Sequence, residues 1–206
     1  MKLAHASRLS TLVLSILFLS ASTDAFAQNV LVNGDFEFGD TTSWEEINVV
    51  PGNSISIVTP DNGPSAPGSF SVLMDNQVDG LALLLKQSSL AGTAGPGDVD
   101  YSFDIKLIEE NAGGVLFIEI FAEQADGGVL GGTGVLGPFF NTEWETVTGS
   151  FVAPAGTDFL TFQFAAITGA NIGSSITVQV DNASLTQDVV SNDDSSWSKV
   201  KATFAN

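Results

Sequence analysis

The stretch Tyr101-Ser-Phe-Asp-Ile-Lys-Leu107 alternates apolar and polar side chains with a period of two. Successive side chains of a β-strand point to opposite faces, so this alternation predicts a strand with one buried and one exposed face. The stretch Ile176-Thr-Val-Gln-Val180 repeats the pattern. These two segments therefore predict a sheet that covers a core on one side and meets solvent on the other.

Further strands are expected on both sides of this pair. Val115–Ala122 and Phe159–Ala166 are uniformly apolar and rich in Phe and Ile, which predicts strands near the middle of the structure. Turn formers such as Gly95-Pro96-Gly97 separate the segments. Other strands are expected at residues 30–33, 47–50, 55–59, 70–74, 81–87 and 145–152. Roughly eight to ten short strands without a long helical pattern predict an all-β fold, a jelly-roll β-sandwich of two antiparallel sheets.

A glycine-rich stretch interrupts this pattern at residues 126–137. Its glycines are at positions 127, 128, 131, 132, 134 and 137. We interpret the stretch as a loop, either a flexible rim loop near a ligand site or a mobile hairpin connection.

The N-terminal segment has the three parts of a secretory signal. Lys2 and Arg8 precede an apolar run from Leu12 to Leu19, and Ala25-Phe26-Ala27 offers small residues at the cleavage positions. The apolar run is shorter than the roughly 20 residues that span a bilayer. We therefore expect residues 1–27 to be a cleaved signal peptide, with no membrane span in the mature chain and a secreted or cell-surface location.

The C-terminal segment, residues 187–206, departs from the strand pattern. Trp197, Val200 and Phe204 follow an Asp/Ser-rich stretch with helical spacing, which predicts a short amphipathic helix. A late edge strand and a disordered tail are the alternative structural interpretations of this segment. The functional hypothesis is that it serves as a docking or sorting tag. The segment 28–186 would then be the folded domain.

Composition excludes most catalytic chemistry. The chain has no Cys, and its single His and single Arg are His5 and Arg8 in the predicted signal. The mature chain would therefore lack Ser-His-Asp and Cys-His catalysis and His- or Cys-ligated metals. Carboxylate pairs such as Glu109 and Glu110, or Glu143 and Glu145, could support glycoside cleavage, but nothing distinguishes them from surface charge. We expect a protein that is not an enzyme.

The mature chain would carry four lysines against 23 acidic residues, a net charge of −19. Such a chain repels nucleic acid and anionic membrane surfaces and attracts cations, of which Ca²⁺ is the obvious extracellular one.

Three motifs carry a resemblance to a known family. They are the opening Asn29-Val-Leu-Val-Asn-Gly-Asp-Phe-Glu-Phe-Gly-Asp-Thr-Thr-Ser-Trp44, then Trp144-Glu-Thr-Val-Thr-Gly-Ser-Phe-Val-Ala-Pro154, then Val180-Asp-Asn-Ala-Ser-Leu185. In this order they resemble the carbohydrate-binding modules of families 4, 9 and 22. The resemblance covers residues 29–186 and implies a galactose-binding-like jelly roll. It also implies a structural Ca²⁺ site between the first and last motifs, with Asp35, Glu37 and Asp181 as candidate ligands.

The expected function is a secreted, non-catalytic module that binds extracellular or cell-wall polysaccharide. The alternative is a calcium-dependent assembly protein of a cell surface, biofilm matrix or extracellular filament, with self-assembly as one partner interaction. Trp44, Trp144, Tyr101 and most Phe residues are expected in the core, leaving no aromatic platform for a sugar ring. The candidate ligand-binding residues are the polar side chains Asp104, Glu119, Gln163 and Gln179, on strand faces expected to be exposed.

Overall fold

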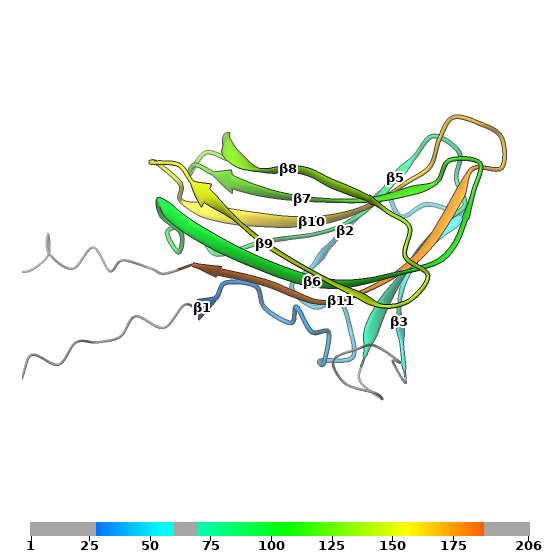
Figure 1. The fold of residues 1–206 in the computed structure, drawn as a ribbon, viewed down its shortest axis with the longest axis horizontal. Helices are drawn as coiled ribbons and strands as arrows, with labels where there is room; N and C mark the ends of the chain where they lie inside the picture. The colour runs from blue at the N-terminus through cyan, green and yellow to red at the C-terminus, as the bar shows by residue number, and fades with distance from the viewer. Residues whose placement is uncertain (1–27, 60–69, 188–206) are drawn as a thin grey trace, which may run out of the picture.

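The computed structural model describes residues 28–59 and 70–187, which form two stacked antiparallel sheets (Figure 1). The predicted signal peptide and the C-terminal segment from residue 188 lie outside the described residues. Within the described ranges every regular element is a strand, and no helix long and apolar enough to cross a membrane is present. The prediction of an all-β sandwich is confirmed.

Sheet A has the strand order β3-β4-β11-β6-β9, with β1 paired to the end of β11. Its strands are β1 (Gln28–Asn29), β3 (Asn53–Val58), β4 (Ser71–Asn76), β6 (Gly97–Asn111), β9 (Glu145–Ala153) and β11 (Ser175–Gln187). Sheet B has the order β2-β5-β10-β7-β8. Its strands are β2 (Glu45–Ile47), β5 (Ala82–Ser88), β7 (Val115–Glu123), β8 (Val129–Phe139) and β10 (Phe159–Ile167). The two apolar segments expected near the middle, β7 and β10, are both internal strands.

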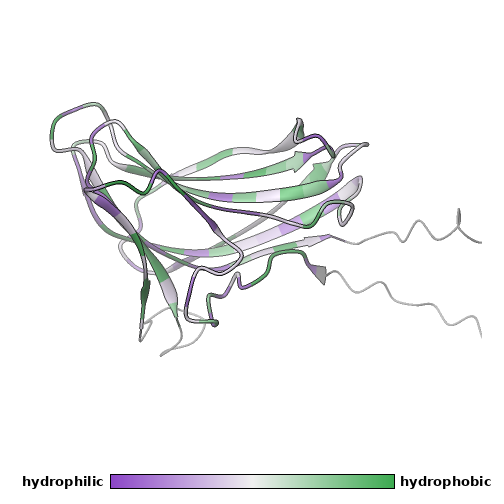
Figure 2. Cartoon of the chain, turned by 180° about the vertical axis from the view of Figure 1, so that it is seen from behind, coloured by the Kyte–Doolittle hydropathy of each residue, from purple (hydrophilic) through white to green (hydrophobic). Residues whose placement is uncertain are grey.

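Aromatic rings join the two sheets. The ring of Phe103 on β6 meets the rings of Phe162 and Phe164 on β10 edge-on, with centroids 5.7 and 6.1 Å apart. All three side chains are fully buried. The indole ring of Trp44 completes this aromatic cluster, with its centroid 5.9 Å from that of Phe164. Along each strand the inward apolar side chains alternate with outward ones, and Figure 2 shows the resulting bands of contrasting hydropathy.

The glycine-rich stretch is not a loop, and this prediction was wrong. Residues 129–139 form β8, the edge strand of sheet B, paired antiparallel with β7. The pairing shifts register at three places, and Gly132, Gly134 and Gly137 have φ angles of 155°, 66° and 108°. Residues with side chains rarely adopt such angles, so the glycines permit a bulged strand.

Two predicted strands near the N-terminus are displaced. Residues 30–33 lie beyond β1. The amide of Val32 donates to the side-chain Oε1 of Gln87 at 2.6 Å, and the Nε2 of Gln87 donates to the carbonyl of Val32 at 2.8 Å. That amide takes the place of a neighbouring strand. The strand expected at 47–50 is β2 instead, which ends at Ile47 because Asn48 adopts a φ of 63°.

The first motif folds into a loop that closes on the last motif. The carbonyl of Asn33 accepts a bond of 3.0 Å from the indole Nε1 of Trp44, which is buried. The amide of Ala183 donates to the carbonyl of Gly34 at 2.8 Å. A Cβ built on Gly34 would lie 2.0 Å from the carbonyl oxygen of Ala183. The motif therefore needs glycine at this position because the loop and β11 approach too closely for a side chain.

The core prediction holds for Trp44 but not for Trp144. Tyr101 packs against the core and stacks on Phe103, with centroids 6.2 Å apart. Trp144 directly precedes β9, is half-buried and lies outside the buried core cluster.

We expect Gly34→Ala to lower the free energy of unfolding by about 1–3 kcal/mol, the usual cost of forcing extra atoms into a packed contact. The measurement is urea denaturation followed by circular dichroism. Gly95→Ala is the matched control, since a Cβ there would meet no atom within 4 Å. Equal stability of the two variants would contradict the close approach of the loop to β11.

Candidate functional site

A row of polar side chains crosses the outer face of sheet B. Glu45 of β2, Lys86 of β5, Gln163 of β10 and Glu119 of β7 are consecutive partners in the strand register. The amide Nε2 of Gln163 donates to the Oε2 of Glu119 at 3.2 Å. These four residues are named the polar row below. Two of them, Glu119 and Gln163, are candidate ligand-binding residues from the sequence, and the structure brings them together.

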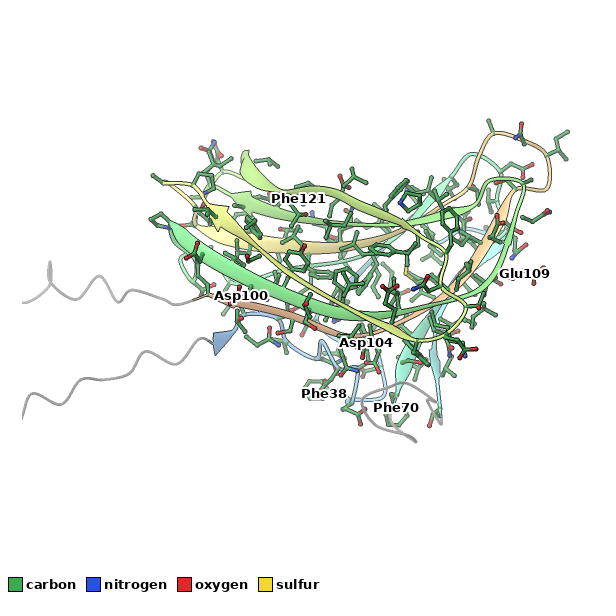
Figure 3. The ribbon with its side chains drawn as sticks, in the orientation of Figure 1. Phe38, Phe70, Asp100, Asp104, Glu109 and Phe121 are labelled. Carbon is green, nitrogen blue, oxygen red and sulfur yellow. The ribbon has the colours of Figure 1, made fainter. Side chains whose placement is uncertain are left out.

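Two phenyl rings flank the polar row. Phe117 and Phe121 lie two residues before and after Glu119 on β7, so their side chains leave the sheet on the same face. Both are half-buried, and Figure 3 shows Phe121 on the outer side of sheet B. Their register partners on β10 are the small residues Ala165 and Thr161.

The small residues on β10 form a floor between larger neighbours. Thr161 and Ala165 point outward, yet they are only 0% and 2% exposed. Thr161 lies between Phe121 and Ser88, and its hydroxyl is 2.7 Å from the hydroxyl of Ser88. The outer face therefore offers ring faces, a hydroxyl pair and the charged and amide groups of the polar row over one ordered surface.

The sequence interpretation missed the two rings because it assigned the Phe residues to the core. That assignment is correct for Phe36, Phe103, Phe162 and Phe164, which are fully buried. For β7 a signal was available. Glu119 marks the odd-numbered positions as outward, so the period of two also places Phe117 and Phe121 on that face.

The other two ligand-binding candidates lie on the opposite sheet. Gln179 of β11 is half-buried and pairs with Lys106 on the outer face of sheet A. Asp104 is 2% exposed. Its Oδ1 accepts from the Thr146 hydroxyl at 2.5 Å and its Oδ2 accepts from the Asn182 amide at 2.9 Å. These contacts make Asp104 a support for neighbouring side chains.

The candidate calcium ligands are not gathered into a carboxylate cluster. Asp35 and Glu37 are exposed on the N-terminal loop, and Asp181 is buried on β11. The Oδ1 of Asp35 accepts from the Glu37 amide at 3.4 Å, and Glu37 accepts from the Phe70 amide at 3.1 Å. Among the residues described, no three acidic side chains lie close enough to hold a metal ion. A cation here would have to rely largely on backbone carbonyls, and the calcium site stays a prediction.

The same loop contains an acidic group whose pKa is lowered by its neighbours. Hydrogen bonds from the Thr42 side chain and backbone amide lower the pKa of the exposed Asp40 carboxyl. This group lies outside the polar row.

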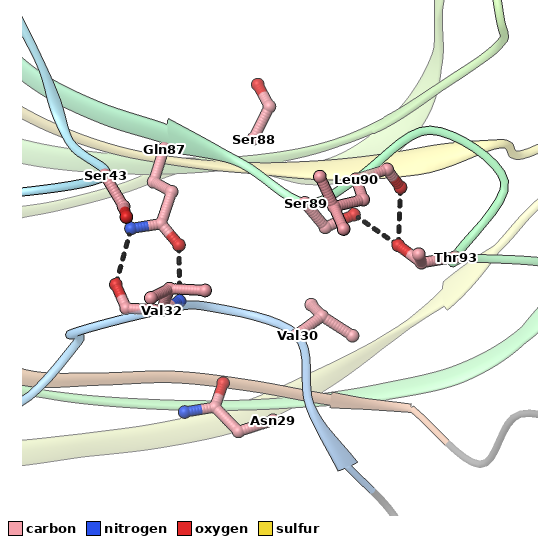
Figure 4. Close-up of a pocket in the computed structure, with 9 residues that line it drawn as sticks. All are labelled: Asn29, Val30, Val32, Ser43, Gln87, Ser88, Ser89, Leu90 and Thr93. Carbon is pink, nitrogen blue, oxygen red and sulfur yellow. Dashed lines mark hydrogen bonds between the residues drawn. The ribbon is translucent and has the colours of Figure 1, made fainter.

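A cavity of about 440 Å³ opens beside the end of β5 (Figure 4). Its walls are the apolar side chains Val30, Val32 and Leu90, and the Gln87 amide closes one side. The Thr93 hydroxyl donates to the Leu90 carbonyl at 2.5 Å and also lies 3.2 Å from Ser89 Oγ. Ser88 lines the cavity and also pairs with Thr161, so the cavity adjoins one corner of the outer face of sheet B.

Comparison with known proteins gives fold relatives only. No family model and no curated protein matches the chain. Solved structures do match, and several of them are carbohydrate-binding modules. A family 61 module in complex with β-1,4-galactotriose superposes with a TM-score of 0.53 at 14% identity, covering 77% of this chain and 98% of that one. A family 16 carbohydrate-binding module has a TM-score of 0.52 at 15% identity, covering 77% of this chain and 100% of that one.

A larger protein contains the same fold. The enzymatically active domain of tailspike protein 4 of bacteriophage CBA120 matches with a TM-score of 0.61 at 13% identity. The match covers 76% of this chain but only 21% of the tailspike chain. At these identities the comparisons establish that the chain has the β-sandwich fold of carbohydrate-binding modules, and function must be argued from the surface.

Proposed function

We propose that this chain is a secreted, non-catalytic module that binds polysaccharide on the outer face of sheet B. The observation that carries the proposal is the placement of Phe117 and Phe121 on either side of the polar row, on one outward face. Sugar rings have apolar faces edged by hydroxyls, and flat aromatic rings with nearby polar groups are the protein surface that complements them.

The shape of this face suits a polymer. The polar row starts on β2 and reaches β7 across four adjacent strands, and β8 lies beyond it. Strands about 4.8 Å apart give the five-stranded face a width of roughly 20 Å. The face continues along β7 through both rings, so a ligand on it would contact several groups in succession and could extend past either edge of the sheet.

Three further observations support the proposal. Several of the fold relatives are carbohydrate-binding modules, and one was solved with a galactose trisaccharide. From residue 28 onward the chain has no His, Arg or Cys, which removes catalysis that depends on those side chains. Secretion rests on the signal-like segment 1–27.

We expect the protein to be retarded by at least one soluble neutral polysaccharide in affinity gel electrophoresis. Phe121→Ala and Phe117→Ala should each weaken that binding about tenfold, since truncating a central aromatic contact typically costs over 1 kcal/mol. Glu119→Gln should weaken it less, because the amide keeps part of the hydrogen bonding.

The matched control is Phe140→Ala, which removes another exposed ring, 54% accessible, from beyond the end of β8 rather than from beside the polar row. Thermal melting verifies that all variants are folded. Absence of retardation on every neutral polysaccharide, or equal losses for Phe121→Ala and Phe140→Ala, would refute the proposed surface.

A structural calcium ion is a separate part of the proposal. Two observations support it. The chain is acidic, and a depression between the N-terminal loop and β11 is lined by the oxygen-bearing side chains of Asp35, Asn182 and Ser184. Calcium added to chelator-treated protein should raise the Tm by several degrees, because an ion that binds only the folded state stabilises it. Asp35→Asn should remove the increase and Asp126→Asn should not. A Tm that does not respond to calcium would end this part of the proposal.

Assembly at a surface or in a matrix is the second candidate function, and β8 favours it. Residues 129–140 contain no charged side chain, and Val129, Val135 and Phe140 are 60%, 58% and 54% exposed. An exposed apolar edge strand can pair with another chain. We expect light scattering to show concentration-dependent association that Val135→Lys abolishes. A monomer at all concentrations, with and without calcium, would exclude this candidate.

A further inference from the structure

The outer face of sheet A carries a second polar surface, on the side of the sandwich opposite the polar row. Figure 3 shows Asp100, Asp104 and Phe38 on that side and Phe121 on the other. The register aligns Ser184, Ser102 and Thr148 in one line across β11, β6 and β9. The next line along the strands is formed by Thr186, Asp100 and Ser150.

Two depressions follow these lines and meet at one residue. The first, of about 440 Å³, lies over the two lines of hydroxyl and carboxylate groups just described. The second, of about 330 Å³, lies between the N-terminal loop and β11 and is lined by Asp35, Phe38 and Asn182 among others. Ser184 lines both, so the two depressions adjoin at this residue, and together they are named the track below.

An exposed aromatic ring stands at one end of this track. Phe38 is 65% exposed, although its backbone is fixed by a bond of 3.1 Å from its amide to the Asn33 Oδ1. Asn33 is itself buried and also donates to the Asp40 carbonyl at 3.0 Å. The fold therefore holds a large apolar ring in solvent on an anchored loop, next to hydroxyl and carboxylate groups.

Hydrogen bonds hold Asn182, a lining residue of the track, in place. Asp104 binds the side chains of Thr146 and Asn182, which come from the two strands on either side of β6. Asn182 also donates its backbone amide to Asp181 Oδ1 at 2.6 Å. These contacts hold the side chains of three strands in register, so a ligand would meet a preorganised surface.

The charge of the track distinguishes it from the polar row. Its lining includes the exposed carboxylates of Asp35 and Asp100, and neither depression is lined by a lysine. The polar row contains Lys86. Exposed Asp98, on the same face of β6 as Asp100, adds to the negative field, whereas Lys106 on that face lines neither depression. Charge complementarity therefore favours a cationic ligand.

We propose that this track is a second carbohydrate-binding surface that takes a polysaccharide carrying free amino groups. The ammonium groups would lie near Asp100, and near Asp35 where no calcium ion occupies that depression. The sugar hydroxyls would exchange hydrogen bonds with the lines of Ser and Thr, and the Phe38 ring would cover one sugar face. A module with ligands on both sheets could connect two glycan chains.

The test measures binding of soluble glucosamine oligomers by calorimetry at mildly acidic pH, with their fully N-acetylated counterparts as the neutral probe. Phe38→Ala and Asp100→Asn should each weaken binding of the amino form about tenfold or more. Asp126→Asn is the matched control for charge, since Asp126 is exposed in the turn between β7 and β8, and Phe140→Ala is the matched control for the ring. Both controls should bind like the unaltered protein.

Three outcomes would overturn the inference: no binding of the amino form, equal losses for Asp100→Asn and Asp126→Asn, or equal binding of the acetylated form. The second would show that overall acidity alone attracts the polycation. Phe121→Ala separates this inference from the proposed function, because it should leave binding of the amino form unchanged. Loss of all neutral-glycan binding with retention of this interaction would refute the proposed function alone.

Discussion

The packing of Phe162 and Phe164 against Phe103 is the contact on which the rest of the structure depends. It fixes the even-numbered side chains of β10 toward the core and so fixes its odd-numbered side chains outward. Because paired residues of neighbouring strands lie on the same face, the antiparallel register also determines which side chains of β5 and β7 point outward. A slip of one residue would bury Glu119 and expose the core residues of β7, which makes any other register costly.

Both surfaces discussed above follow from this one choice. On sheet B it sets Gln163 beside Glu119 and leaves Phe117 and Phe121 on the same side of β7. On sheet A the same rule, applied from Phe103, turns the polar residues of β6 outward. The sandwich thus presents two different outer faces, one with rings and the mixed charges of the polar row, and the other with lines of hydroxyls and carboxylates beside Lys106. The N-terminal loop, held by Asn33 and Trp44, adds an exposed ring to the second face only.

Much of this could be read from the sequence. Period-two alternation located β6 and β11, and uniform apolar runs located β7 and β10 as internal strands. The failures have local physical causes. Glycines with positive φ made β8 look like a loop, and the Gln87 side chain replaced a strand partner for Val32. The candidate site was half found: Glu119 and Gln163 share a face, whereas Asp104 and Gln179 lie on the other sheet, a division that only the strand order reveals.

The central claim is that the outer face of sheet B binds polysaccharide. The most direct measurement is NMR titration of the isotope-labelled protein with a neutral oligosaccharide cut from a polysaccharide that retards it. The account predicts chemical-shift changes concentrated on the outward residues of β5, β10 and β7, with Lys86, Gln163 and Phe121 among them. Changes confined to the cavity around Leu90 and Thr93, or to sheet A, would contradict it.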